Sequence, residues 1–509
     1  MKKISILFSL FSCWLGTSLA QTPTWAGNVA SIMYNRCTSC HHPGAIAPFS
    51  LMTYADASGL AFDIQDAVNT KTMPPWPPDP TYKPLAHERV LSASEIQTIN
   101  DWVQGGVPAG NLQNAPTPPT YSNQPTIANA DLVSTMPSYT STATTSDMYR
   151  CFVIPSGLSA VNYITGMEVI PGNAEIVHHV LVYQDSTPLP AQLDAQDPGP
   201  GYTSFGGTGS NNSKLIGAWV PGQKPVFYPM GMGVRLAPNT NIILQVHYPK
   251  GSSGQTDATQ ARMKLTTSPS RPLFIAPIIN HGPNLLNGPL FIPANTVKSF
   301  ASQYNLPAVN LSILNISPHM HLIGKSIKAY GVTPQNDTLP YINIPNWDFH
   351  WQGSYMFKTI QKIPASTKLR GEAVYDNTSN NPNNPHNPPQ DVSLGEETDD
   401  EMMLVYFTYT LYFPGDENIV LEQNTNTDLW EEMGDLKIEV FPNPASDKLQ
   451  LTLPQGITSG TLRLIDSKGS IVKSITLEQL LGKDAIDVSD LASGNYTLWL
   501  SSEQKSGYV

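Results

Sequence analysis

The chain has 509 residues, of which 40% are hydrophobic and 13% charged, and its formal net charge is −12. This length exceeds what one hydrophobic core usually organises, so we expect several domains, and the composition excludes a disordered or coiled-coil protein. The acidic balance, without a long basic run, gives no electrostatic support for nucleic acid as a partner.

Residues 1–20 have the pattern of a signal peptide. Two lysines precede the apolar run Ile4–Leu15, and Ser18-Leu19-Ala20 is a small-x-small cleavage site. The apolar run is too short to span a membrane as a mature helix, and nothing later is long enough either. We therefore expect an exported chain whose mature form has no transmembrane segment. A buried N-terminal helix and a lipid anchor at Cys13 are the alternatives.

Cys37-Thr38-Ser39-Cys40-His41 is a C-x-x-C-H motif, which is typical of covalent haem attachment. Cys37 and Cys40 are placed to form thioether bonds to the porphyrin, and His41 to bind its iron. A zinc site would need a second pair of ligands, and a redox dithiol would not need His41. The motif therefore predicts one covalently bound haem c. The remaining cysteine of the mature chain, Cys151, is expected to be a small buried side chain.

The second axial ligand of the haem iron is expected some tens of residues later. Met73 is the best candidate, because the prolines that follow it hold an extended loop suited to presenting a thioether. His42 and His87 are rival ligands. Ser92 to Val103 has the pattern of a capped helix. Residues 21–111 therefore resemble an all-α cytochrome c domain of the kind fused to exported bacterial oxidoreductases.

The pattern changes after a linker and domain entry at residues 112–146, which are rich in proline, serine and threonine. Short alternating apolar runs, such as Ile242–Tyr248 and Met403–Phe413, are then separated by Pro, Gly and Asn clusters. This pattern is typical of β-sandwich or jelly-roll domains. The length suits two mainly β domains, at residues 147–268 and 269–422.

Five of the eleven histidines lie in three short segments of this β region. They are His178 and His179, His247, and the pair His319 and His321. Residues i and i+2 of a strand share a face, so the last pair can reach one metal ion. Adjacent residues point to opposite faces, so the first pair needs a bend, or different ring nitrogens, to share one. Hydrogen-bonded core histidines and a catalytic zinc site are the alternatives.

Four motifs in one order resemble those of the copper type II ascorbate-dependent monooxygenases, which include the peptidylglycine α-hydroxylating and dopamine β-hydroxylating enzymes. The motifs are His178-His179, Leu244-Gln245-Val246-His247-Tyr248, His319-Met320-His321-Leu322-Ile323-Gly324-Lys325 and Asp400-Glu401-Met402. The resemblance implies that His178, His179 and His247 bind an electron-transfer copper. It implies that His319, His321 and Met402 bind a second, catalytic copper that activates oxygen. A thioether ligand favours Cu(I) and is not explained by zinc; Met403 is the rival to Met402.

The resemblance is incomplete where the peptidylglycine branch of the family binds the substrate carboxylate. An arginine two residues before the H-x-H motif is replaced by Ser317, and an asparagine two residues after the methionine by Leu404. The family's tyrosine is kept as Tyr406, a candidate substrate-binding residue. Because a buried carboxylate needs a charged or hydrogen-bonding partner, peptidylglycine is not the expected substrate. Aromatic residues at 347–351 are expected in the core, with a pocket wall as the alternative.

Residues 433–509 are expected to form a small β-sandwich. Val440-Phe441-Pro442-Asn443-Pro444 precedes alternating leucines from Leu449, and a turn is expected at Asp466-Ser467-Lys468-Gly469. This region resembles the C-terminal sorting domain of the type IX secretion system. The resemblance implies that the secretion machinery is a partner and that the protein is secreted or attached to the cell surface. An ordinary accessory sandwich is the alternative.

Together these features predict an exported copper-dependent monooxygenase with two copper ions and one haem c. It would hydroxylate a C–H bond of a small organic substrate with O₂, with electrons from an external donor passing through the haem to the first copper and then the second. The alternative is a non-catalytic haem and copper electron-transfer or copper-binding surface protein. A cytochrome-fused copper nitrite reductase would need a cysteine ligand near a His–Met pair, which Cys151 does not provide.

Overall fold

The computed structural model of the protein describes residues 22–45, 47–121, 125–268, 270–422, 439–452, 461–466, 471–477, 485–494, 496–501 and 506–508. The predicted signal peptide, Cys13 and the turn residues 467–469 lie outside these ranges. The chain forms two compact units that divide between Leu421 and Glu422. No helix among the described residues is long and apolar enough to cross a membrane.

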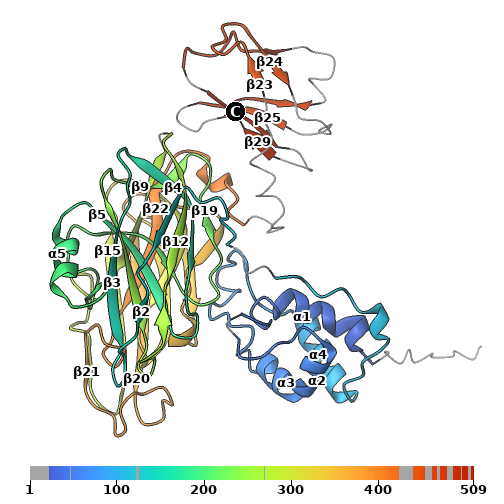
Figure 1. Ribbon diagram of the computed structural model, residues 1–509, viewed down its shortest axis with the longest axis vertical. Coiled ribbons are helices and arrows are strands. Elements are labelled where there is room, and N and C mark those ends of the chain that lie inside the picture. Colours follow the sequence, from blue (N-terminus) through green and yellow to red (C-terminus); the bar gives the residue numbers. More distant parts are fainter. Residues whose placement is uncertain are drawn as a thin grey trace, which may run out of the picture. The chain divides into compact units, whose positions relative to one another are not determined.

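The first unit begins with a group of helices around a core of their own (Figure 1). They are the π-helical turn Trp25–Val29, α1 (Ala30–Arg36), α2 (Tyr54–Gly59), α3 (Ala61–Asn69) and α4 (Ala93–Gln104). A capping box starts α4, because the Ser92 hydroxyl accepts the N–H of Glu95 while the Glu95 carboxylate accepts the N–H of Ser92. Trp25 and Trp102 fill the centre of this core. The helix predicted from Ser92 to Val103 is confirmed to within a residue.

The largest sheet has nine strands. Its order is β1 (Leu132–Thr135), β12 (Gln260–Thr266), β4 (Asn162–Ile170), β9 (Met232–Leu236), β13 (Arg271–Ile279), β22 (Leu404–Leu411), β16 (Leu311–His319) and β19 (Tyr355–Ile363), with β8 (Val226–Phe227) paired to β4. The pairs are antiparallel except β9 with β13, where residues 232–234 run parallel to residues 271–273. Backbone hydrogen bonds therefore link the two predicted β domains into one continuous sheet.

Two smaller sheets carry or support the candidate metal ligands. The five-stranded sheet has the order β6 (Tyr202–Thr203), β3 (Met148–Pro155), β10 (Asn241–Tyr248), β5 (His179–Asp185) and β7 (Lys214–Trp219). The four-stranded sheet has the order β15 (Thr296–Asn305), β20 (Lys368–Asn377), β17 (Gly324–Val332) and β18 (Thr338–Ile344). The short elements are β2 (Tyr139–Thr140) with β11 (Thr256–Asp257), β14 (Phe291–Ile292) with β21 (Val392–Ser393), helix α5 (Leu189–Gln196), and 3₁₀ turns Leu112–Asn114, Phe349–Trp351 and Asp416–Asn418. The mainly β class expected for this region is confirmed.

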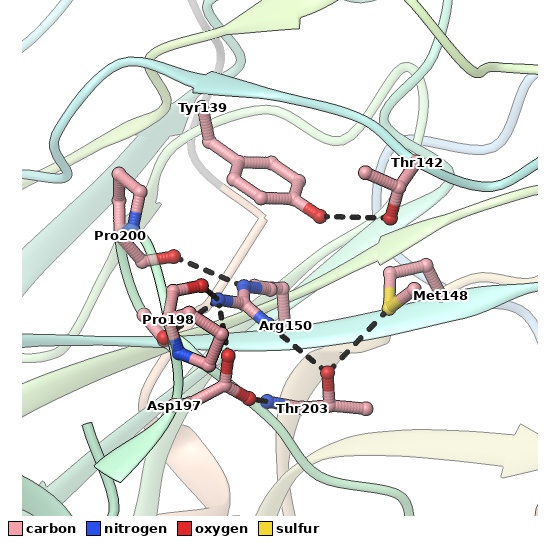
Figure 2. A network of polar contacts seen from close by, with 9 residues as sticks. Tyr139, Thr142, Met148, Arg150, Asp197, Pro198, Pro200 and Thr203 are labelled. Atoms are coloured by element: carbon pink, nitrogen blue, oxygen red, sulfur yellow. Dashed lines mark hydrogen bonds and ion pairs between the residues drawn. The ribbon is translucent and has the colours of Figure 1, made fainter. Parts of the chain in front are cut away.

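A buried arginine holds the loop after α5 against β3 (Figure 2). Arg150 is 6% exposed, and its guanidinium donates to Asp197 Oδ1 at 2.9 Å, to Thr203 Oγ1 at 3.0 Å and to backbone carbonyls of the loop. The Asp197 carboxylate also accepts the N–H of Thr203 at 3.0 Å. A buried guanidinium needs this many acceptors to offset its lost hydration. The network fixes the strand that carries Tyr149 beside the first histidine cluster.

The segment from Trp76 to Arg89 leaves the helices and packs on the second half of the β core. The backbone N–H of Asp79 donates to Asn343 O, and that of Ala86 to Met356 O, both at 2.8 Å. Leu85 is 1% exposed and belongs to the core of the β sheets. This segment therefore attaches the helices to strands β18 and β19 through buried contacts.

In the second unit, from Glu422, the described residues form two small antiparallel sheets. They are β23 (Glu439–Phe441), β24 (Lys448–Thr452) and β27 (Ile486–Asp487), and β26 (Ile471–Thr476), β25 (Thr461–Asp466), β28 (Tyr496–Ser501) and β29 (Ser506–Tyr508). Their core contains Leu449, Leu462, Leu464 and Leu498. The small β unit expected at the C-terminus is confirmed in the described residues.

Candidate metal centres

The first histidine cluster is built by two neighbouring strands. Strands β5 and β10 are antiparallel, and their register places His247 directly opposite His179. His178 lies just before β5 begins, and its backbone N–H donates to the carbonyl of His247 at 2.9 Å. Because His178 is outside the regular strand, its side chain is free of the alternation that would point it away from His179. The rings of His178 and His179 meet through the same ring nitrogen, Nδ1, so different ring nitrogens are not needed.

The three imidazoles face one another at metal-binding distances. Nδ1 of His179 lies 3.2 Å from Nδ1 of His178 and 3.4 Å from Nδ1 of His247, and the ligand atoms of all three lie within 4.8 Å of one another. Burial lowers the pKa of His178 to about 3 and that of His179 well below its usual value. Three imidazoles whose ring nitrogens converge form a cation site. The three histidines therefore fit one metal ion.

Two neighbouring side chains orient His247. The ring of Tyr149 stacks on it with centroids 4.3 Å apart and an interplanar angle of 8°. Asp147 Oδ2 lies 3.3 Å from Nε2 of His247, although the pair is not aligned as a hydrogen bond. Burial alone would raise the pKa of Asp147, but His247 and Thr398 hold it well below its usual range. Nδ1 of His247 is thereby left for a metal ion.

The second cluster is assembled differently from the sequence expectation. His319 is the last residue of β16, but His321 lies beyond the end of the strand. The prediction that both belong to one regular strand is therefore wrong, although the ring centroids are only 5.0 Å apart, at 81°. The buried carboxylate of Glu401 holds the turn, accepting the backbone N–H groups of His321 and Ile323 at 2.9 Å and of Met402 at 3.1 Å.

Hydrogen bonds fix which ring nitrogen of each histidine is available. Nδ1 of His319 lies 2.5 Å from Gln352 Oε1, and Nδ1 of His321 lies 3.2 Å from the carbonyl of Asp400. Gln352 donates its amide NH₂ to Phe349 O at 3.0 Å, which turns its oxygen toward His319. Both partners accept, so Nδ1 carries the proton and Nε2 presents a lone pair. Burial lowers the pKa of His319 to about 4 and of His321 to about 3.

The two candidate methionines have different surroundings. Met402 lines a cavity together with both histidines of the second cluster, and its carbonyl accepts the Tyr375 hydroxyl at 2.7 Å. Met403 is fully buried in the core of the β sheets. A thioether beside two imidazoles suits Cu(I). Met402 therefore shares the cavity with the two histidines, whereas Met403 lies in the core.

A cavity of about 350 Å³ is lined by residues of both clusters. His179 from the first cluster and His319, His321 and Met402 from the second line it, as does Tyr406. Aromatic side chains form much of the remaining wall: Tyr149, Tyr183, Trp219, Phe227 and Tyr228. Burial raises the pKa of Tyr406 to about 12, so its hydroxyl stays protonated. A mostly apolar cavity next to a metal site can hold a small organic molecule.

Sequence reasoning missed two residues of the site, His281 and Glu401 in its supporting role. His281 follows β13, lines the cavity, and its Nδ1 accepts the backbone N–H of Met403 at 3.0 Å. It belongs to no spaced motif, and only the pairing of β13 with β22 brings it to the site. Glu401 belongs to the motif Asp400-Glu401-Met402. Its place directly before the candidate ligand Met402 was the signal in the sequence that it could support the site.

Phe349 lies between the two histidine clusters. Its ring stacks on His178 with centroids 4.9 Å apart at 14°, and meets the edge of His321 at 6.0 Å and 85°. Trp347 donates its indole N–H to the carbonyl of His321 at 3.1 Å. Trp347 and Phe349 are buried, as expected of core residues, and they support the histidines instead of lining the cavity.

The C-x-x-C-H segment follows α1. The N–H of Cys37 donates to Met33 O at 2.8 Å, and the N–H of His41 to Cys37 O at 3.0 Å. Nδ1 of His41 lies 3.2 Å from the carbonyl of Phe49, so this nitrogen carries the proton and Nε2 is left for an iron ion. Both thiols are free. These three residues fit covalent haem attachment.

The candidate axial ligands on the other side of the haem have varied settings. Met73 is half-buried after α3, where its N–H donates to Ala67 O at 3.2 Å. The ring of its rival His42 stacks on Tyr121, with centroids 4.1 Å apart.

Cys151 is fully buried beside Tyr202 and Ile243, and burial raises the pKa of its thiol to about 12. It is the small buried side chain that was expected.

Comparison with known families gives three matches along the chain. Residues 133–254 match the copper type II ascorbate-dependent monooxygenase N-terminal domain, and residues 294–431 match its C-terminal domain. Residues 439–508 match the secretion system C-terminal sorting domain.

Solved structures give only weak likenesses. The infectious bursal disease virus VP2 subviral particle is 8% identical, with 62% of this chain and 89% of that chain covered and a TM-score of 0.14. The BSP domain of a biofilm associated protein is 9% identical, with coverage of 74% and 82% and a TM-score of 0.12. The PBSX exported protein XepA is 10% identical, with coverage of 52% and 92% and a TM-score of 0.13. At such TM-scores these likenesses carry no argument about this chain.

Proposed function

Because the chain carries both domains of the copper type II ascorbate-dependent monooxygenases, we propose that it hydroxylates a C–H bond of an organic substrate with O₂, with electrons supplied through a covalently bound haem. The sorting domain at residues 439–508 indicates export by type IX secretion, to the medium or the cell surface. The family relationship makes the protein a copper monooxygenase; the reaction, the haem and the individual ligands are what we propose beyond it.

The observation that carries the proposal is that one cavity is lined by residues of both histidine clusters. His178, His179 and His247 would hold the first copper, and His319, His321 and Met402 the second. Copper bound there would supply one-electron chemistry and oxygen activation. A non-catalytic copper-binding protein would not need an apolar cavity beside the second cluster, so the cavity favours catalysis.

The chain's own residues prepare the site for that chemistry. Gln352 and the Asp400 carbonyl keep Nε2 of His319 and His321 unprotonated. Glu401 fixes the backbone of the turn that carries His321 and of the methionine segment. The aromatic wall and Tyr406 border a cavity with room for a substrate whose polar groups are few. These features give the substrate a defined place next to the oxygen-activating ligands.

The haem would be held by Cys37, Cys40 and His41, with Met73 as the second axial ligand. As a one-electron carrier it would supply, or supplement, the reductant that ascorbate supplies in the family. The docking segment, residues 76–89, follows Met73 directly and packs on the copper core, which supports an electron path within one chain.

The proposal is tested by copper-loaded full chain incubated with a reductant, ¹⁸O₂ and a library of small organic compounds. A product carrying one labelled oxygen atom is expected from the wild type, and none from Met402→Ala, whose haem spectrum is expected to be unchanged. Labelled product from Met402→Ala at the wild-type rate would contradict the ligand assignment. In rapid mixing, reduced haem is expected to reoxidise in step with product; reoxidation uncoupled from product would defeat the haem's role.

A further inference from the structure

His281 lies in the cavity but belongs to neither metal-ligand set. It is half-buried after β13 and lines the cavity together with His319 and Met402. His281 and His319 therefore border the same space. The proposed function gives this third imidazole no task.

The hydrogen bond of His281 fixes its tautomer. Its Nδ1 lies 3.0 Å from the backbone nitrogen of Met403. A backbone N–H can only donate, so Nδ1 must present a lone pair and the ring proton must sit on Nε2. A doubly protonated ring would set two N–H groups against each other. The hydrogen bond therefore excludes the cation as well as the other neutral tautomer.

This tautomer is the reverse of the one in the second cluster. His319 and His321 carry the proton on Nδ1 and offer a lone pair from Nε2, whereas His281 offers an N–H from Nε2. With Nδ1 occupied and Nε2 protonated, His281 is not a ligand in this arrangement. Among the described residues, no hydrogen bond is made by its Nε2–H, so this cavity-lining residue has a donor available.

The other polar groups of the cavity indicate which kind of substrate acceptor this N–H group can bind. Ser317 and Leu404 stand where the peptidylglycine branch has a carboxylate-binding arginine and asparagine. Three charged side chains line the cavity. The carboxylate of Glu168 already accepts the backbone N–H groups of Thr126 and Ile127, and Lys224 and Glu396 lie at the exposed part of the lining. A neutral N–H in an apolar setting pairs best with a neutral acceptor, because a buried carboxylate would lack a counter-charge.

We propose that His281 is a substrate-binding residue whose Nε2–H donates to a carbonyl oxygen of an apolar, uncharged substrate. The inference rests on the proposed function and specifies its substrate class as neutral carbonyl compounds with an aromatic or aliphatic body. The donor would anchor one end of the molecule while the aromatic wall encloses the rest. A site built to hydrogen-bond a substrate group discriminates against analogues that lack it.

The test uses the reduced, anaerobic full chain loaded with Cu(I), which is diamagnetic, and labelled with [¹⁵N]histidine. Long-range ¹H–¹⁵N spectra are expected to show His281 protonated at Nε2, its signals being identified by their loss in His281→Phe. Acetophenone is then titrated against α-methylstyrene, which has the same shape but a methylene group in place of the carbonyl oxygen. Acetophenone is expected to bind roughly five- to tenfold more tightly to the wild type and to shift Nε2 of His281.

In His281→Phe the preference for acetophenone is expected to vanish, whereas it persists in the control His386→Phe, outside the cavity. A proton on Nδ1 of His281, equal or undetectable binding of the two probes to the wild type, or an unchanged preference in His281→Phe would overturn the inference. If the variant fails to fold, the wild-type spectra and the wild-type affinities for the two probes still test the inference. Absence of labelled product in the ¹⁸O₂ experiment would instead defeat the proposed function, without changing either NMR result.

Discussion

Glu401→Gln is expected to damage the second metal site alone. In the wild type, one carboxylate oxygen accepts the N–H groups of His321 and Met402, and the other accepts that of Ile323. The amide oxygen of glutamine can replace only one of them, and its NH₂ then faces a backbone N–H. This holds whether or not the glutamate is ionised: burial raises its pKa to about 8, against the opposing effect of backbone N–H groups that include those of His321, Met402 and Ile323.

A buried N–H left without an acceptor costs about 1–3 kcal/mol, so we expect the free energy of unfolding to fall by about 2 kcal/mol. The larger consequence is a shift of His321 and Met402 relative to each other. Loss of a group that orients metal ligands lowers metal affinity by roughly 10- to 100-fold. The affinity of the second site for copper is expected to fall by this factor, and the affinity of the first site is expected to stay unchanged.

The assay is an anaerobic titration of Cu(I) against a chromophoric chelator that resolves two binding steps. The matched control is Glu397→Gln, the same change four residues earlier, whose side chain makes no hydrogen bond to the metal-ligand segments within the described part of the chain. If Glu401→Gln bound both copper ions with wild-type affinity, the carboxylate would not organise the second site. Equal weakening of both sites would also refute the reasoning, because His178, His179 and His247 do not contact Glu401 through any of these hydrogen bonds.

Three further predictions concern stability and the contact between the clusters. Arg150→Met is expected to lower the free energy of unfolding by about 2–3 kcal/mol, because the carbonyls of Pro200 and Gly201 lose a buried donor. Arg36→Met removes a more exposed guanidinium and is expected to lower it by about 1 kcal/mol or less. The chelator-treated protein is expected to lose stability as the pH falls below 6.5, since the buried imidazoles of the two clusters stay neutral when folded but take up protons when unfolded; a melting temperature equal at about pH 5 and about pH 7.5 would contradict this. Phe349→Ala is expected to change the electron paramagnetic resonance signals of both oxidised copper sites, whereas a change at only one would show that the ring does not connect them.

From residue types and spacings, the sequence predicted which histidines meet more accurately than it predicted the local structure around them. His178, His179 and His247 were found as candidates from sequence, and the antiparallel register of β5 and β10 brings them together. The pair His319 and His321 was also found, but for a reason that fails: the strand ends at His319. The turn that follows depends on Glu401, which lies 80 residues away in sequence, and no local pattern reports such a contact.

Tertiary pairing accounts for what the sequence could not predict. The parallel pairing of β9 with β13 joins the two β regions into one sheet, and neither strand carries a signal for its partner. His281 reaches the cavity only because β13 pairs with β22. The docking segment has few regular elements, yet Leu85 is buried in the β core. Each of these features is decided by which segments meet, a choice that periodicity within one segment does not encode.

The most direct test of the account is the copper content of the purified full chain after anaerobic loading with Cu(I) and removal of loosely held metal. Two copper ions per chain are expected, one of them with a sulfur ligand by X-ray absorption. His179→Ala is expected to lose the ion without sulfur, and Met402→Ala to lose the sulfur signal. One ion or none in the wild type, or loss of both ions in either variant, would contradict the two-centre account.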